Sequence, residues 1–199
     1  MRAAEWTRHF RPPDVPTTSS LRRGTDSTME LRFIAPHLRR LDCASTEVLV
    51  ATTLIDERPA HGVAGLIDWR LSGRISRLMI EGFATGKLGE VLLLPGKPHM
   101  PYDKLLLFGA GARADFGERV YRDVLQRILA TLEGLRARAA VVQLPGRHFG
   151  GITAEQAAAI LLEMSASHPD HDVWTLVEPP EAHRVISQQL AQERRRILK

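Results

Sequence analysis

The sequence predicts an α/β domain of three layers, in which helices cover both faces of a mixed, mostly parallel sheet. Short apolar runs typical of strands alternate along the chain with segments of helical periodicity. The 199 residues are 44% hydrophobic and 25% charged, which suits one globular domain with a substantial core.

The patterned part of the chain begins at Met29. Residues 1–28 hold three prolines, a Thr-Thr-Ser-Ser run and scattered charge without apolar periodicity. We therefore expect a disordered tail, followed by one domain over residues 29–199. Either Met1 or Met29 could be the start of translation.

Two strands and a helical region are expected next. Residues 30–34 alternate like a half-buried strand, and residues 47–54 form a β-rich apolar run. A loop at 55–62 then leads into a helical pattern over 66–79, which Gly73 could interrupt.

Two continuous apolar runs follow, at 90–94 and 104–108, joined by a turn at 95–103. Because all or nearly all of their positions are apolar, we expect strands buried on both faces. Asp115 and Glu118 have the spacing of a capping box, so they predict the start of a helix of about five turns.

Strand and helix alternate again to the end of the chain. Residues 139–144 and 173–177 read as strands, Thr153 caps the helix between them, and Pro180 starts the last helix. Ligands of such sheets bind outside the carboxyl ends of the strands, so function is expected in the loops there. These loops follow Leu54, Phe108, Leu144 and Val177.

The formal net charge of +4 lies at the ends of the chain rather than in its body. Residues 29–180 hold 17 basic and 18 acidic residues. We interpret the basic ends as solubilising surface and keep nucleic acid only as a minor alternative partner.

Cysteine content and hydropathy limit the location of the protein. Cys43 is the only cysteine, which excludes a disulfide framework and indicates a reduced thiol. No apolar run approaches the roughly 20 residues of a membrane span, and residues 1–28 lack the apolar core of a secretory signal. A cytoplasmic protein with no membrane partner is expected.

The loop 145–151 is the best candidate for a phosphate site. It contains Gly146, Gly150 and Gly151 and leads into a capped helix, where backbone N–H groups and the helix dipole favour an anion. The alternative is that its glycines only permit tight turning and close helix packing. His148 is expected to be a loop residue rather than a catalytic base.

Three other motifs favour ordinary structure over chemistry. Gly109-Ala110-Gly111 resembles a fragment of a dinucleotide fingerprint but suits a strand-to-helix turn. The sequence His168-Pro169-Asp170-His171 is interpreted as a surface turn rather than a metal site, because proline prevents the two imidazoles from converging on a helix. Trp69 is expected to pack against the core. We expect no catalytic residue, no bound metal and no cofactor.

The order of motifs resembles the amino-terminal domain of the leucyl aminopeptidase, or cytosol aminopeptidase, family of zinc peptidases. The resemblance implies a domain standing alone without the catalytic domain. It rests on these stretches: Leu66-Ile67-Asp68, the G-x-x-x-G-K-x-G-E element at 82–90, K-L-L-L-F-G-x-G at 104–111, and 153–158.

That domain is similar to a macro domain, which implies two ligand-facing loops. Residues 61–67 resemble the first glycine-rich loop, and Pro145 to Gly150 resemble the second, phosphate-facing loop. Arg147 stands where the macro pattern carries glycine, so its side chain could either block or bind a phosphate. The ligand-binding residues implied are Gly62, Val63, Gly109, Gly111, Gly146, Arg147, Phe149, Gly150 and Gly151.

The chain contains no asparagine. The family's catalytic half carries an Asn-Thr-Asp-Ala-Glu-Gly-Arg stretch that binds two metals, and macro-domain hydrolases generally use an asparagine near the ribose. The resemblance therefore implies a non-catalytic module for binding, regulation or assembly, through self-association or a protein partner. The alternatives are a binder of an ADP-ribose-like or phosphorylated small anion and, third, a metal-dependent aminopeptidase.

Overall fold

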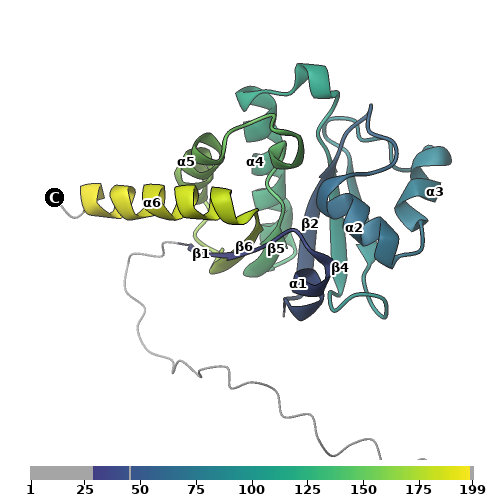
Figure 1. Cartoon of the computed structure of the whole chain (residues 1–199), viewed down its shortest axis with the longest axis horizontal. Coiled ribbons are helices and arrows are strands. Elements are labelled where there is room, and N and C mark those ends of the chain that lie inside the picture. Colours follow the sequence, from purple (N-terminus) through teal and green to yellow (C-terminus); the bar gives the residue numbers. More distant parts are fainter. Residues whose placement is uncertain (1–28, 45, 198–199) are drawn as a thin grey trace, which may run out of the picture.

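The computed structural model describes residues 29–44 and 46–197, so the tail expected at 1–28 lies outside the described residues. Helices cover both faces of one central sheet, as the sequence predicts (Figure 1). The elements are β1 (Glu30–Ile34), α1 (Leu38–Cys43), β2 (Val48–Thr53), α2 (Gly62–Arg70), α3 (Arg74–Ile80), β3 (Val91–Pro95), β4 (Lys104–Gly109), η1 (Arg113–Asp115), α4 (Glu118–Gly134), β5 (Ala139–Val142), η2 (Arg147–Phe149), α5 (Ala154–Ser165), β6 (Val173–Val177) and α6 (Pro180–Ile197).

The described strands form a sheet in the order β1-β6-β5-β2-β4-β3. All neighbours are parallel except β3, which runs antiparallel to β4 at one edge. In the centre of the sheet, Val50 of β2 is aligned with Leu106 of β4 and Val142 of β5. The carboxyl ends of β1, β6, β5, β2 and β4 therefore lie at the same edge of the sheet.

Each face of the sheet buries its own core. Val50 and Phe108 pack on the side of α4 and α5, whereas Leu49 and Leu107 pack on the side of α1, α2 and α3. Successive side chains of a strand point to opposite faces, so covering both faces requires continuous apolar runs in the central strands. A smaller cluster, which includes Ile186, joins α6 to α5.

The expectation that residues 90–94 are buried on both faces is wrong. In edge strand β3, Val91 and Leu93 are 38% and 52% exposed, whereas Leu94 is buried. The corresponding expectation for β4 is confirmed, since Leu105 to Phe108 are buried. A continuous apolar run does not distinguish a central strand from an edge strand, because neighbours decide its burial.

The helical region after β2 breaks at Gly73, as the sequence suggested. Gly73 has φ +78° and separates α2 from α3. The buried carboxylate of Asp68 accepts hydrogen bonds from the backbone N–H groups of Ile75 and Ser76 at 2.7 and 3.1 Å, which caps α3. Trp69, expected to pack against the core, is instead 69% exposed.

Two further sequence expectations need correction. The capping box at Asp115 is wrong, because α4 begins three residues later, after Gly117, and Asp115 belongs to η1. The short helix α1 was not predicted; its six residues are too few to show a period. Thr153 does cap α5, accepting a hydrogen bond from the N–H of Gln156 at 3.3 Å.

The His168–His171 segment is a turn, but it is not wholly a surface turn. His168 lies within 2.9 Å of the Glu133 carboxylate, and His171 is buried against the ring of Trp174. Within residues 29–44 and 46–197, no three histidine, cysteine or acidic side chains are grouped in a way that could hold a metal ion. None of the described helices combines the length and hydropathy that a membrane crossing needs.

Candidate functional site

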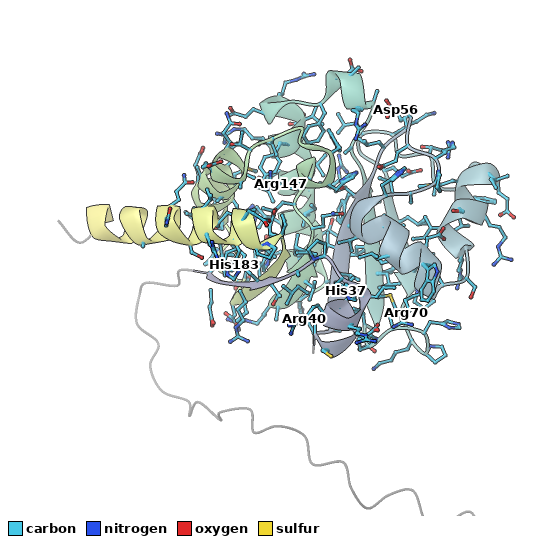
Figure 2. All side chains as sticks on the ribbon, in the orientation of Figure 1. His37, Arg40, Asp56, Arg70, Arg147 and His183 are labelled. Atoms are coloured by element: carbon cyan, nitrogen blue, oxygen red, sulfur yellow. The ribbon has the colours of Figure 1, made fainter. Side chains whose placement is uncertain are left out.

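The loops that follow β2, β4 and β5 meet at the carboxyl edge of the sheet and enclose a pocket of about 330 Å³. Figure 2 shows Asp56 at the upper end of the molecule, where these loops emerge. All but one of the side chains lining the pocket are polar or charged. The lining residues are Leu54, Asp56, Glu57, Arg58, His61, Arg113 and His148.

Glu57 is the centre of this pocket's hydrogen bonding. Its side chain is only 8% exposed, and its carboxylate contacts two imidazoles. His148 Nε2 lies 3.1 and 3.2 Å from the two carboxylate oxygens, and His61 Nδ1 lies 3.1 Å from Oε1. His148 is buried, whereas the side chain of His61 is 61% exposed. The buried acid thus orients one internal and one solvent-facing histidine.

A second acid ties the loop after β2 to the loop after β4. Both carboxylate oxygens of Asp56 accept from the backbone N–H of Arg113 at 3.1 Å. The guanidinium of Arg113 lies over the ring of Phe149, 4.7 Å from its centre. This cation–π contact joins η1 to η2 across the pocket rim.

The Glu90 carboxylate fixes the backbone at Thr85 and Gly86, close to the loops that border the pocket. Its oxygens accept from Thr85 N at 2.9 and 3.0 Å and from Gly86 N at 2.6 Å. The carbonyl of Gly86 accepts from Gly111 N, and the carbonyl of Gly111 accepts from Ile55 N. The motif at 82–90 therefore has a structural role: it fixes the two loops that border the pocket.

Arg147, in the predicted phosphate loop, turns inward. Its Nε and Nη2 each donate to a carboxylate oxygen of Glu178 at 3.0 Å, and its Nη1 donates to the carbonyl of Ile152 at 2.7 Å. The side chain of Glu178 is 1% exposed and that of Arg147 is 13% exposed. This geometry directs the guanidinium toward the protein rather than toward the pocket.

The glycines of the predicted phosphate loop permit close packing. A Cβ atom at Gly146 would lie 2.2 Å from the ring of Phe116, and one at Gly151 would lie 2.4 Å from the ring of Phe149. Gly150 has φ +73° and faces open space. Phe116 packs against Phe149 of this loop edge to face, with ring centroids 5.2 Å apart.

The remaining predicted residues, Gly62, Val63 and Gly109, pack against neighbouring groups and do not line the pocket. Gly62 begins α2 and contacts His148, and the N–H of Val63 donates to the side chain of Gln143 at 3.1 Å. Gly109 packs against the backbone at Lys87. The pocket lies among three of the loops that the sequence nominated, but none of the nine nominated residues is among those that line it.

The lining residues that the sequence reasoning missed carry a signal of their own. Asp56, Glu57, Arg58 and His61 crowd into one short loop directly after a buried strand. Four chargeable side chains at the carboxyl end of a central strand indicate a polar site, and glycine spacing gives no information about them.

A larger and more open hollow of about 540 Å³ lies at the opposite, amino-terminal edge of the sheet. Among its lining acids, Asp42 pairs with Arg70, Glu47 with Lys104, and Asp103 with Lys97. Its charges are thus neutralised locally, and it lies away from the loops at the carboxyl ends.

Curated relatives of this chain are aminopeptidases. The cytosol aminopeptidase of Pseudomonas aeruginosa is 32% identical over 124 residues, which cover 60% of this chain and 25% of that protein. A probable cytosol aminopeptidase of Pseudomonas fluorescens is 36% identical over 104 residues, covering 50% of this chain and 21% of that protein. The chain spans about a quarter of the length of these relatives.

Solved structures share the fold at low identity. The macrodomain of Mycobacterium tuberculosis DarG has a TM-score of 0.58 and 17% identity, covering 75% of this chain and 99% of that one. The Oceanobacillus iheyensis macrodomain with ADP has a TM-score of 0.62 and 14% identity, covering 78% and 88%. A tomato leucine aminopeptidase mutant has a TM-score of 0.55 and 17% identity, covering 83% and 36%.

These structural likenesses confirm the macrodomain-like α/β fold expected from the sequence. The model of the cytosol aminopeptidase family's N-terminal domain matches residues 48–168, which is more than half of the chain. By this match, the chain belongs to the cytosol aminopeptidase family through its N-terminal domain.

Proposed function

We propose that this chain is a non-catalytic binding module that takes a small anionic ligand in the pocket lined by Asp56, Glu57, Arg58, His61 and Arg113. The observation that carries the proposal is the convergence of three loops on this polar pocket at the carboxyl edge of the sheet. Parallel α/β sheets place their ligands at this edge.

The non-catalytic part of the proposal rests on the residues present. Two-metal hydrolysis needs several carboxylates that converge on metals about 3.5–4 Å apart. In the described part of the chain, no group of three candidate ligands does so, and the whole sequence lacks asparagine. The residues present therefore support a role in binding, regulation or assembly.

The structural neighbours nominate the first ligand to test. One Oceanobacillus iheyensis macrodomain structure holds ADP. Arg58 and Arg113 line this chain's pocket and would pair with the phosphate groups of an ADP-ribose-like ligand. By contrast, Arg147 is held by Glu178, so Arg147→Glu would disturb folding and gives a poor test of binding.

Calorimetric titration of the full chain with ADP-ribose tests the proposal. If the pocket takes an ADP-ribose-like ligand, Arg113→Glu should weaken its binding at least tenfold. Arg77→Glu, an equal charge change on the exposed face of α3, should leave the affinity unchanged. Absence of binding by the wild-type chain would reject ADP-ribose as the ligand.

Assembly is the second candidate, because large apolar side chains stay exposed on α3, on the segment after it and on edge strand β3. Ile80 is 83% exposed, Phe83 67% and Leu93 of edge strand β3 52%. Exposed apolar groups and unpaired edge strands favour association. If the chain assembles there, light scattering will show an oligomer that Leu93→Lys dissociates; a monomer at high concentration would exclude self-association.

Aminopeptidase activity is the third reading, suggested by the names of the relatives, of which the chain spans about a quarter. A leucine-anilide assay with added zinc or manganese tests it. Metal-dependent turnover would overturn the non-catalytic proposal.

A further inference from the structure

The arrangement of Glu57 between two histidines points to the chemistry of the ligand, and this inference rests on the proposed anion site. An ionised carboxylate only accepts hydrogen bonds, so each neutral imidazole must place its single N–H toward Glu57. This assigns the proton of His61 to Nδ1 and that of His148 to Nε2. The remaining nitrogens, His61 Nε2 and His148 Nδ1, then carry lone pairs and cannot donate to an anion.

One of these nitrogens indicates an incomplete site. His148 Nδ1 is buried and has no hydrogen-bond partner among the described residues, although His148 lines the pocket. Buried polar atoms without a partner are uncommon in folded proteins and call for a ligand or water. As an acceptor, this nitrogen calls for an O–H or N–H donor, such as a water molecule or a ligand hydroxyl beside the anion, rather than for the anion itself.

The fixed charges of the pocket cancel. Asp56 and Glu57 are balanced by Arg58 and Arg113, and these four are the charged groups that line the pocket beside the two histidines. Histidine is the side chain whose charge ordinarily changes between pH 5 and 8. Protonation of the exposed His61 would therefore make the pocket cationic and turn Nε2 into a donor.

The predicted phosphate loop at residues 145–151 is closed by its own packing, which limits the size of the anion that the site can take. Phe116 and Phe149 cover Gly146 and Gly151, and the N–H of Gly151 already donates to the carbonyl of Gly146 at 2.9 Å. The space left is the pocket of about 330 Å³ beside His61, which is also the residue preceding α2, where the helix dipole favours an anion.

We propose that the pocket binds a single phosphate group, as in a phosphomonoester, together with one proton that His61 takes up at Nε2. The proton comes from the solvent, and the protonated imidazole donates to the phosphate while its Nδ1–H stays on Glu57. Arg58 and Arg113 supply the remaining positive charge. Binding thus tightens as the pH falls.

Inorganic phosphate and sulfate are the probes, titrated calorimetrically into the full chain at pH 6 and pH 8. Sulfate stays a dianion at both pH values, so its pH dependence reports protonation of the protein alone. We expect sulfate to bind about tenfold more tightly at pH 6 than at pH 8, while inorganic phosphate, which changes its own protonation over this range, tests binding alone. Repeating the sulfate titration in buffers of different ionisation enthalpy should show net uptake of a fraction of a proton per anion.

Matched histidine variants locate the proton. His61→Gln should weaken sulfate binding at pH 6 and abolish both its pH dependence and its proton uptake, and the exposed position of His61 leaves folding intact. His99→Gln, on the exposed loop between β3 and β4, should bind as the wild type does. Thermal melts of both variants check that the fold is retained.

The outcomes separate this inference from the proposed function. Binding of ADP-ribose without proton uptake, or with His61→Gln unaffected, would overturn the inference and leave the binding module standing. Binding of phosphate and sulfate through His61 without binding of ADP-ribose would support the inference and reject ADP-ribose. If neither anion nor ADP-ribose binds at either pH, both proposals fail.

Discussion

Arg147 and Glu178 form a bidentate ion pair that joins the loop after β5 to the end of β6. Both donor–acceptor distances are 3.0 Å, and the side chains are 13% and 1% exposed. The backbone N–H of Glu178 also donates to the carbonyl of Ile34 at the end of β1. The ion pair and this backbone hydrogen bond together join the ends of three strands at the carboxyl edge of the sheet.

Removing the acid of this ion pair should lower the stability of the fold. Glu178→Gln leaves a buried guanidinium without a counter-charge, so we expect the free energy of unfolding to fall by about 3 kcal/mol. Urea denaturation measures it. Glu30→Gln removes the acid of the exposed pair with Arg32 and should change stability by less than about 1 kcal/mol. Equal effects of the two substitutions would show that burial of the Arg147 pair does not matter.

Two glycines of the G-x-x-x-G-K-x-G-E element at residues 82–90 provide a second test of stability. Gly86 and Gly82 both have positive φ, +74° and +80°, but only Gly86 is crowded, since an added Cβ would lie 2.4 Å from the backbone of Leu54. Gly82→Ala should cost about 1–2 kcal/mol from backbone conformation alone. Gly86→Ala should cost clearly more, and unfolding midpoints of the two variants would reveal the difference. Similar midpoints would mean that the loop moves freely to relieve the contact.

Stability should fall below pH 6.5 because of His171. Burial, with a smaller contribution from the nearby His168, lowers the pKa of His171 from its ordinary value of 6.5. As the pH falls below 6.5 the unfolded chain binds this proton before the folded chain does, so acid favours unfolding. His171→Gln should reduce the loss in urea midpoint between pH 7.5 and 5.5. An unchanged loss would assign the pH dependence to other groups.

The cap of α5 can be tested at one atom. Thr153 Oγ1 accepts from the N–H of Gln156, so Thr153→Ala should lower the free energy of unfolding by about 1 kcal/mol. Thr153→Ser keeps the hydroxyl and should retain most of the stability. If the serine variant loses as much as the alanine variant, the threonine methyl group rather than the cap is responsible.

Local patterns predicted much of the fold. The strands at 30–34 and 173–177 have the bounds expected, and Gly73 and Thr153 mark a helix break and a helix start. These features depend on neighbours in the chain, through side-chain alternation, a positive φ and one local hydrogen bond. The capping box at Asp115 failed because the spacing of two side chains does not fix where the backbone first turns helical.

The sequence nominated loops that border the candidate pocket, but not the side chains that line it. Glycines drew attention to residues 145–151, yet Phe116 and Phe149 cover that loop and Glu178 takes Arg147. Glu57 meets His148, which lies 91 residues further along the chain. No local pattern reports such a contact, because it depends on the order of strands in the sheet.

The sequence alone determined the fold class, most strand and helix positions and the edge of the sheet where a site should lie, because these follow from hydrophobic periodicity and the geometry of parallel strands. The tertiary structure decided which strand became an exposed edge, which charges became buried partners and which side chains face the pocket. Burial and pairing of charges depend on residues distant in sequence, so only the folded chain selects Glu57, His61 and Arg113 over the glycines.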